Sequence, residues 1–150
     1  MKITDYSSMA MNIISNGWHL PLVNGKVNSS NIEDKIVKIC NYLELKDRHV
    51  VAVNTGTSAL HLAVELCDIQ KDDEIIVPSF NFVADQVAIE MAGAKVVMCD
   101  IRDDNLGIDC KKAEELISDK TKAIIPVHLG GNICEMNKIK KIAKKYKINT

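Results

Sequence analysis

The feature that most constrains the fold is an alternation, from residue 49 onward, between short apolar runs and longer segments of helical composition. The apolar runs, rich in β-branched residues, predict buried strands at 49–53, 73–79, 94–101 and 121–129. Helical composition or spacing predicts helices at 57–67, 82–93, 109–119 and 134–147, and a further strand opens at 148–150. Short buried strands alternating with helices predict an α/β fold: a mostly parallel sheet with helices on both faces.

Two positions are candidates for ending or capping these helices. Gly93 is expected to close the helix at 82–93 and Asp109 to cap the helix at 109–119.

The N-terminal part differs from this alternation. Residues 31–45 carry apolar side chains at helical spacing, with Ser30 or Asn31 as a possible N-cap. Residues 1–30 are polar and interrupted by glycine and proline, which predicts an irregular N-terminal segment that wraps the surface or lines a site. Because a strand only begins at 148–150, we interpret residues 31–150 as the N-terminal, truncated part of a larger α/β domain.

Composition excludes several classes of protein. The 150 residues are 47% hydrophobic and 26% charged with a formal net charge of −1, which argues against disorder and against recruitment of nucleic acid. No apolar run reaches the roughly 20 residues that span a bilayer, and no secretory signal is evident. The five cysteines are odd in number and lack C-x-x-C spacing, so we expect reduced thiols in the cytoplasm and no metal site.

The stretch "NTGTSALHLAV" at 54–64 follows the first predicted strand and begins a helix. A helix N-terminus offers free N–H groups and a partial positive charge; Gly56 allows close backbone approach, and Thr57 and Ser58 add hydroxyl groups. This predicts a phosphate cradle. The alternative is that Thr57 or Ser58 merely caps the helix. No P-loop and no dinucleotide-binding G-x-G-x-x-G motif is present.

The next predicted strand ends in "PSFNFVAD" at 78–85, which holds both phenylalanines of the chain, Phe80 and Phe82. An aromatic ring beside a phosphate cradle can stack on a flat heteroaromatic ligand, although a lone phenylalanine here would more often belong to the core. One phosphate and one flat ring together point to pyridoxal 5′-phosphate (PLP).

The fourth predicted strand ends in "PVHLGGN". His128 is expected to be a core histidine with satisfied hydrogen bonds, and a general base or a ligand contact are the alternatives. Gly130 and Gly131 are expected to form a tight loop.

Five blocks resemble, in order and spacing, the PLP-dependent sugar aminotransferases of the DegT/StrS type. They are "NTGTSALHLAVEL", "DDEIIVPSFNFVA", "AGAKVVMCDI", "TKAIIPVHLGGN" and "KIKKIAKKYKI", preceded by "SNGW" at 15–18 and by Gly25, Lys26 and Val27. The resemblance implies a type I aminotransferase fold, a homodimer, and amino transfer, commonly from glutamate, to a keto sugar linked to a nucleotide. It implies that Gly56, Thr57 and Ser58 hold the cofactor phosphate and that Phe82 stacks on its ring. Residues 15–18 and 128–132 would then lie near the sugar-nucleotide pocket.

The chain also departs from this family's pattern. The family usually has threonine where Asn81 and Asp85 stand, and often glutamine where Asn132 stands, so substrate identity stays open. The aspartate that pairs with the pyridine nitrogen and the Schiff-base lysine have no match within these residues. The lysines of 134–147 are expected to be solvated charges on a helix face. Three alternatives therefore stay open: a sugar dehydratase of the same family, an inert fragment or binding half of a split protein, and a generic α/β binding module.

Overall fold

The fold centres on a parallel three-stranded sheet. The computed structural model describes residues 22–23, 26–27, 29–42, 44–45 and 50–150. Strands β3 (Glu74–Pro78), β4 (Lys95–Cys99) and β5 (Thr121–Ile124) pair in parallel in the order β4-β3-β5. An isolated parallel bridge between Ala123 and Asn149 continues the sheet beyond β5, where the sequence predicted a new strand. The predicted α/β class is confirmed.

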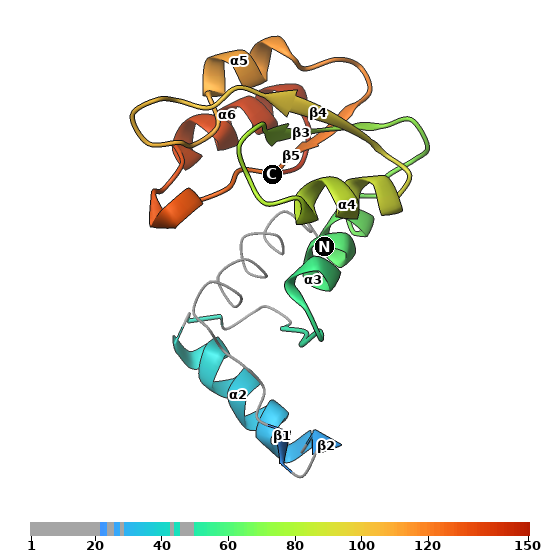
Figure 1. Cartoon of the computed structure of the whole chain (residues 1–150), viewed down its shortest axis with the longest axis vertical. Helices are drawn as coiled ribbons and strands as arrows, with labels where there is room; N and C mark the ends of the chain where they lie inside the picture. The colour runs from blue at the N-terminus through green and yellow to red at the C-terminus, as the bar shows by residue number, and fades with distance from the viewer. Residues whose placement is uncertain (1–21, 24–25, 28, 43, 46–49) are drawn as a thin grey trace.

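Helices cover both faces of this sheet (Figure 1). Helices α3 (Gly56–Glu65) and α4 (Ala84–Met91) lie on one side, and α5 (Cys110–Glu115) and α6 (Met136–Tyr146) on the other. The period of two along β3 explains this division, because Ile75 and Val77 belong to the core beneath α3 and α4, whereas Ile76 belongs to the core beneath α5 and α6. All three side chains are fully buried.

The predicted helix ends on this unit agree with the structure. Asp109 caps α5, since its Oδ1 accepts from the N–H groups of Lys111 at 2.8 Å and Lys112 at 3.2 Å. Gly93 follows α4 with a φ of +83°, a conformation that favours glycine, and its N–H donates to Glu90 O at 3.0 Å.

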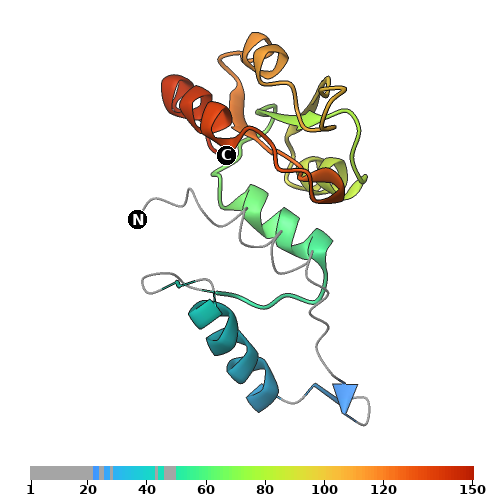
Figure 2. The same cartoon turned by 90° about the vertical axis from the view of Figure 1, so that its left-hand side faces the viewer.

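The described part of the N-terminal region lies apart from the sheet in both views (Figures 1 and 2). Strands β1 (Leu22–Val23) and β2 (Lys26–Val27) form a short antiparallel pair, and helix α2 (Ser29–Tyr42) follows. The predicted helix at 31–45 is confirmed, but it begins earlier, so Ser30 and Asn31 lie inside it instead of capping it.

The buried strand predicted at 49–53 is wrong for the residues that the structure describes. Residues 50–53 adopt no strand, and the Val51 side chain is 64% exposed. A strand must pair its backbone N–H and C=O groups with a neighbour. Both sides of β3 are already occupied by β4 and β5, and 50–53 pairs with neither of those strands. Apolar composition alone therefore did not make these residues a strand, because no neighbouring strand pairs with them.

The strand predicted at 121–129 is shorter than expected. It ends at Ile124, although Ile125 N still donates to Ile76 O at 2.9 Å. Pro126 has no N–H to continue the ladder.

Among the described residues, no helix has both the length and the apolar character needed to cross a membrane. The five cysteines are all free thiols.

Candidate functional site

The first turn of α3 is closed by Thr55. This residue has extended backbone angles (φ −145°, ψ 160°), and its Oγ1 accepts from the N–H of Ser58 at 3.0 Å. The expectation that Thr57 or Ser58 is the N-cap is thus wrong. A cap must precede the first helical residue and reach the N–H three positions on, which only Thr55 does here.

The Ser58 hydroxyl is already engaged within the cap. It donates to Asn54 Oδ1 at 2.9 Å and lies 2.9 Å from Thr55 Oγ1. The remaining groups of the predicted cradle are the N–H groups of Gly56 and Thr57 and the Thr57 hydroxyl, for which the described residues provide no partner. They stand at the positive end of the α3 dipole, a position suited to an anion. Gly56 and Thr57 therefore fit a phosphate better than Ser58 does.

The cap predicts a stability effect that is independent of any ligand. We expect Thr55→Ala to lower the free energy of unfolding by about 1 kcal/mol, because the Ser58 N–H loses its acceptor. Chemical denaturation of the two proteins measures this difference. Thr55→Ser keeps the hydroxyl and should retain most of the stability; equal stability of parent and alanine variant would contradict the role of the cap.

The two phenylalanines lie just beyond the carboxyl end of β3. Their side chains are 57% exposed at Phe80 and 76% exposed at Phe82, so neither is the core aromatic that a lone phenylalanine would usually be. Leu60 of α3 and Ala84 and Ala88 of α4 share one core cluster, which holds the two helices side by side. The open ring of Phe82 thus sits immediately before a helix that packs against the one carrying Gly56 and Thr57.

A buried acid–amide contact lies in the same connection. Asn81 Nδ2 donates to Asp85 Oδ2 at 2.9 Å, and Asp85 is only 4% exposed. Burial raises the pKa of the Asp85 carboxyl to about 6. The nearby N-terminus of α4 favours the ionised form by up to about 2 kcal/mol, which is about one and a half pKa units, so burial still dominates. The Asn81 Oδ1 atom is buried and has no described hydrogen-bond partner.

Comparison with known proteins decides the family. A model of the DegT/DnrJ/EryC1/StrS aminotransferase family matches residues 21–150. The chain belongs to this family.

Individual relatives agree with this membership. The dTDP-3-amino-3,6-dideoxy-alpha-D-galactopyranose transaminase of Aneurinibacillus thermoaerophilus is 36% identical over 149 residues, which are 99% of this chain and 39% of the relative. The GDP-perosamine synthase of Caulobacter vibrioides is 41% identical over 101 residues, 67% of this chain and 27% of the relative. The chain thus spans between about a quarter and two fifths of these relatives' length.

A solved structure extends the match to three dimensions. NtdA from Bacillus subtilis, determined with bound cofactor PMP, superposes with a TM-score of 0.75 at 32% identity, over 96% of this chain and 32% of that one. The DegT/DnrJ/EryC1/StrS chain therefore has part of the type I aminotransferase fold, and its family is of the PLP type.

The loop after β5 does not bury His128 as the sequence predicted. His128 is exposed, so the prediction of a core histidine is wrong, although its Nδ1 does accept from Cys134 N at 3.2 Å. Gly130 and Gly131 have φ angles of +60° and +86° and lie in the short helical turn η1 (Leu129–Gly131), which confirms a tight loop. The predicted pocket residues 15–18 lie outside the described residues.

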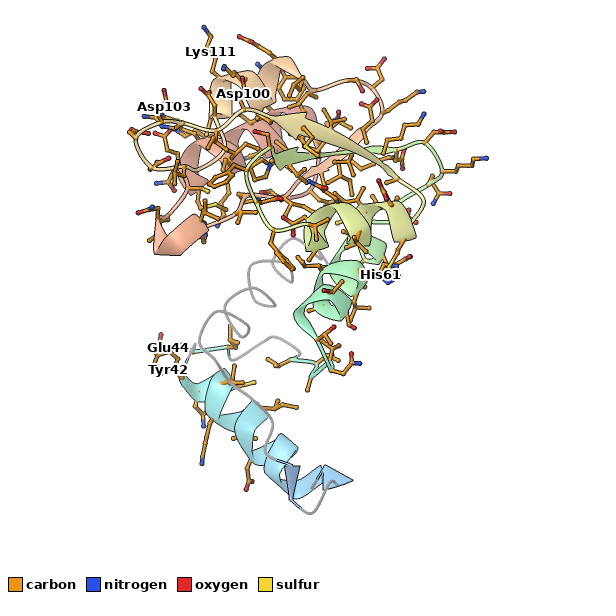
Figure 3. All side chains as sticks on the ribbon, viewed as in Figure 1. Tyr42, Glu44, His61, Asp100, Asp103 and Lys111 are labelled. Atoms are coloured by element: carbon orange, nitrogen blue, oxygen red, sulfur yellow. The ribbon has the colours of Figure 1, made fainter. Side chains whose placement is uncertain are left out.

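The lysines of the C-terminal helix are solvated, as predicted. All are exposed: Lys138, Lys140, Lys141, Lys144, Lys145 and Lys147. Lys138 pairs with Glu135 at 2.6 Å and Lys145 with Glu114 at 2.7 Å. Figure 3 shows a second charged region at Asp100 and Asp103, which follow β4, and at Lys111 on α5, whereas His61 lies on α3 beside α4. These charges therefore lie across the sheet from the candidate site on α3 and α4.

Two features of the site escaped the sequence analysis. No sequence signal singled out Thr55 as the cap, because Thr57 and Ser58 have the same chemistry. The bond between Asn81 and Asp85 joins two of the three positions expected to depart from the family pattern, and their spacing of four residues was the only available signal. Spacing alone does not reveal that Asp85 is buried.

Proposed function

We propose that this chain is the N-terminal part of a PLP-dependent aminotransferase that acts on a keto sugar linked to a nucleotide, with glutamate as amino donor. Such an enzyme serves sugar or surface-polysaccharide biosynthesis, as a cytoplasmic homodimer. Support comes from family membership and from relatives named as a transaminase of a dTDP-sugar and an aminotransferase of UDP-4-amino-4-deoxy-L-arabinose.

The observation that carries the proposal is the open N-terminus of α3, a helix that packs against α4, which directly follows the connection presenting Phe82. Gly56 and Thr57 donate their free N–H groups, and Thr57 its hydroxyl, to the cofactor phosphate. Phe82 covers one face of the pyridine ring and excludes water from it. When bound, PLP supplies the electron sink on which amino transfer depends. By family resemblance, the aspartate at the pyridine nitrogen and the Schiff-base lysine come from sequence outside these 150 residues.

Binding of pyridoxamine 5′-phosphate tests this cradle. We use the amine form because it cannot react with the many surface lysines. Thr57→Ala should weaken its affinity about tenfold or more, since a hydrogen bond to a charged phosphate contributes about 1.5–3 kcal/mol. Isothermal titration calorimetry or ligand-detected NMR gives the dissociation constants.

Two controls define the result. Thr57→Ser keeps the hydroxyl and should retain most of the affinity, and inorganic phosphate should compete with the ligand in the parent chain. Lack of saturable binding by the parent, or equal affinity of parent and alanine variant, would overturn the assignment of the cradle.

A further inference from the structure

We propose that Asp85 is a positioning residue: as a neutral carboxylic acid it closes a ring of two hydrogen bonds with the Asn81 side-chain amide, and this ring holds the segment that carries Phe82. The acid–amide ring rests on one hydrogen bond and one unpartnered amide oxygen, and it is independent of any ligand. Its role toward the cofactor rests on the proposed function.

One of the two hydrogen bonds is present in the structure. Asn81 Nδ2 donates to Asp85 Oδ2 at 2.9 Å. A primary amide carries its N–H and C=O side by side, and a carboxylic acid carries its C=O and O–H in the same arrangement. Once the first bond forms, a proton on Asp85 Oδ1 can therefore be donated to Asn81 Oδ1 and complete the ring.

The unpartnered atom is the one that this proton would satisfy. Asn81 Oδ1 is buried and receives no hydrogen bond from the described residues. A buried acceptor without a donor is costly. An ionised Asp85 cannot help, because a carboxylate has no proton to donate, and turning the amide over would still leave the amide carbonyl oxygen without a donor. The neutral acid satisfies both ends of the amide.

The described surroundings contain no positive charge that would keep Asp85 ionised. The elements packed against α4 are α3, β3 and β4. Three of their ionisable side chains have other partners: His61 lies 3.2 Å from Glu65, Glu74 accepts from Ser118, and Lys95 pairs with Asp72. Two others are located elsewhere: Cys99 belongs to the core on the opposite face of the sheet, and Glu90 of α4 is exposed. Burial is accordingly the cause that raises the pKa of Asp85 to about 6.

The acid–amide ring restrains the segment that carries Phe82, the candidate residue for stacking on the cofactor. Phe82 and Val83 lie between the two hydrogen-bonded residues, and neither side chain is buried, at 76% and 52% exposure. Val83, the residue before α4, makes no side-chain capping bond. The side-chain pair thus supplies the restraint that a cap gives at other helix starts.

The sign of the pH dependence follows from the raised pKa. Between the ordinary carboxyl value near 4 and the value of about 6 in the folded chain, the folded protein retains a proton that the unfolded chain releases. This contribution to stability is therefore complete below the lower value and is lost as the pH rises through about 6. Across that window, the unfolding equilibrium constant rises by up to about tenfold per pH unit.

The first experiment measures the proton directly. NMR of the ¹³C-labelled side-chain carboxyl of Asp85 in the 150-residue chain should give a titration midpoint near 6. Asp85→Asn imitates the neutral acid, because its amide can make both bonds at every pH, so the variant should lack the parent's extra pH dependence of unfolding. Asp119→Asn, a change at an exposed carboxyl, should keep it. An ordinary midpoint near 4, or parallel stability curves for parent and Asp85→Asn, would overturn the acid–amide ring.

The second experiment measures positioning. The affinity for pyridoxamine 5′-phosphate is compared between parent and Asp85→Asn at pH 5 and pH 8, so that titration of the ligand itself cancels in the ratio. At pH 8 the parent has lost the second bond and should bind about two- to tenfold more weakly than the variant, whereas at pH 5 the two should bind alike. A ratio of one at both pH values would overturn the positioning role. If neither protein binds, the proposed function fails, while the carboxyl titration still decides the ring.

Discussion

Replacing Ile76 with alanine is expected to lower the free energy of unfolding by about 2–5 kcal/mol. Ile76 is fully buried at the centre of β3, and its side chain packs in the core beneath α5 and α6 with Ile108, Ile124 and Ile139. Because β3 is flanked by a strand on each side, the neighbours cannot collapse readily into the space that the side chain leaves. Chemical denaturation followed by circular dichroism measures the loss.

A graded series separates this cavity from a general effect of mutation. Ile76→Val removes one methylene group and should cost about 0.5–1.5 kcal/mol. Lys140→Ala, on the exposed face of α6, should change stability by less than about 0.5 kcal/mol. If Ile76→Ala were as stable as Lys140→Ala, β3 would not be the centre of the fold.

Replacing Phe82 with alanine is expected to weaken binding of pyridoxamine 5′-phosphate by about ten- to hundredfold. Covering one face of the ring removes apolar area from water, and stacking adds about 0.5–1.5 kcal/mol. The phenylalanine side chain is 76% exposed, so its removal should leave the free energy of unfolding nearly unchanged. Titration calorimetry and denaturation of the same variant test both halves of this expectation.

Phe80 provides the matched control for this experiment. It lies two residues away, is 57% exposed and follows the same strand, so Phe80→Leu alters a similar aromatic side chain without touching the predicted stacking position. Phe82→Tyr keeps the ring and should retain most of the affinity. Equal weakening by the changes at Phe80 and Phe82 would mean that the stacking residue is assigned wrongly.

Much of the fold was predictable because its signals are local. The apolar runs at 73–79 and 94–101 contain the strands β3 and β4. The helices that follow them, α4 and α5, begin within two residues of their predicted starts. Asp109 and Gly93 act as predicted because capping and left-handed backbone conformations depend on one residue and its near neighbours. The predicted strand at 49–53 failed for the opposite reason, since a strand exists only with a partner that its own sequence does not specify.

The candidate site was predictable in part for the same reason. The turn at 54–58 and the phenylalanines after β3 were recognisable from residue type and order. Which hydroxyl closes the cap was missed, because Thr55, Thr57 and Ser58 are chemically similar and only the backbone angles distinguish them. His128 was expected in the core and is exposed, because the chain leaves the strand ladder after Ile125, before it reaches His128.

By itself, the sequence determined the class of fold, the family and the order of the elements, because these depend on periodicity and on motifs within short stretches of chain. Only the tertiary structure decided which polar groups are buried. Asp85 and Asp119 are the same residue type in helical or turn segments, yet one is enclosed by packed elements beside an amide and the other faces water. Burial depends on what the rest of the chain places around a side chain, and burial determines whether a carboxyl group is a solvated charge or a neutral acid that can donate a hydrogen bond.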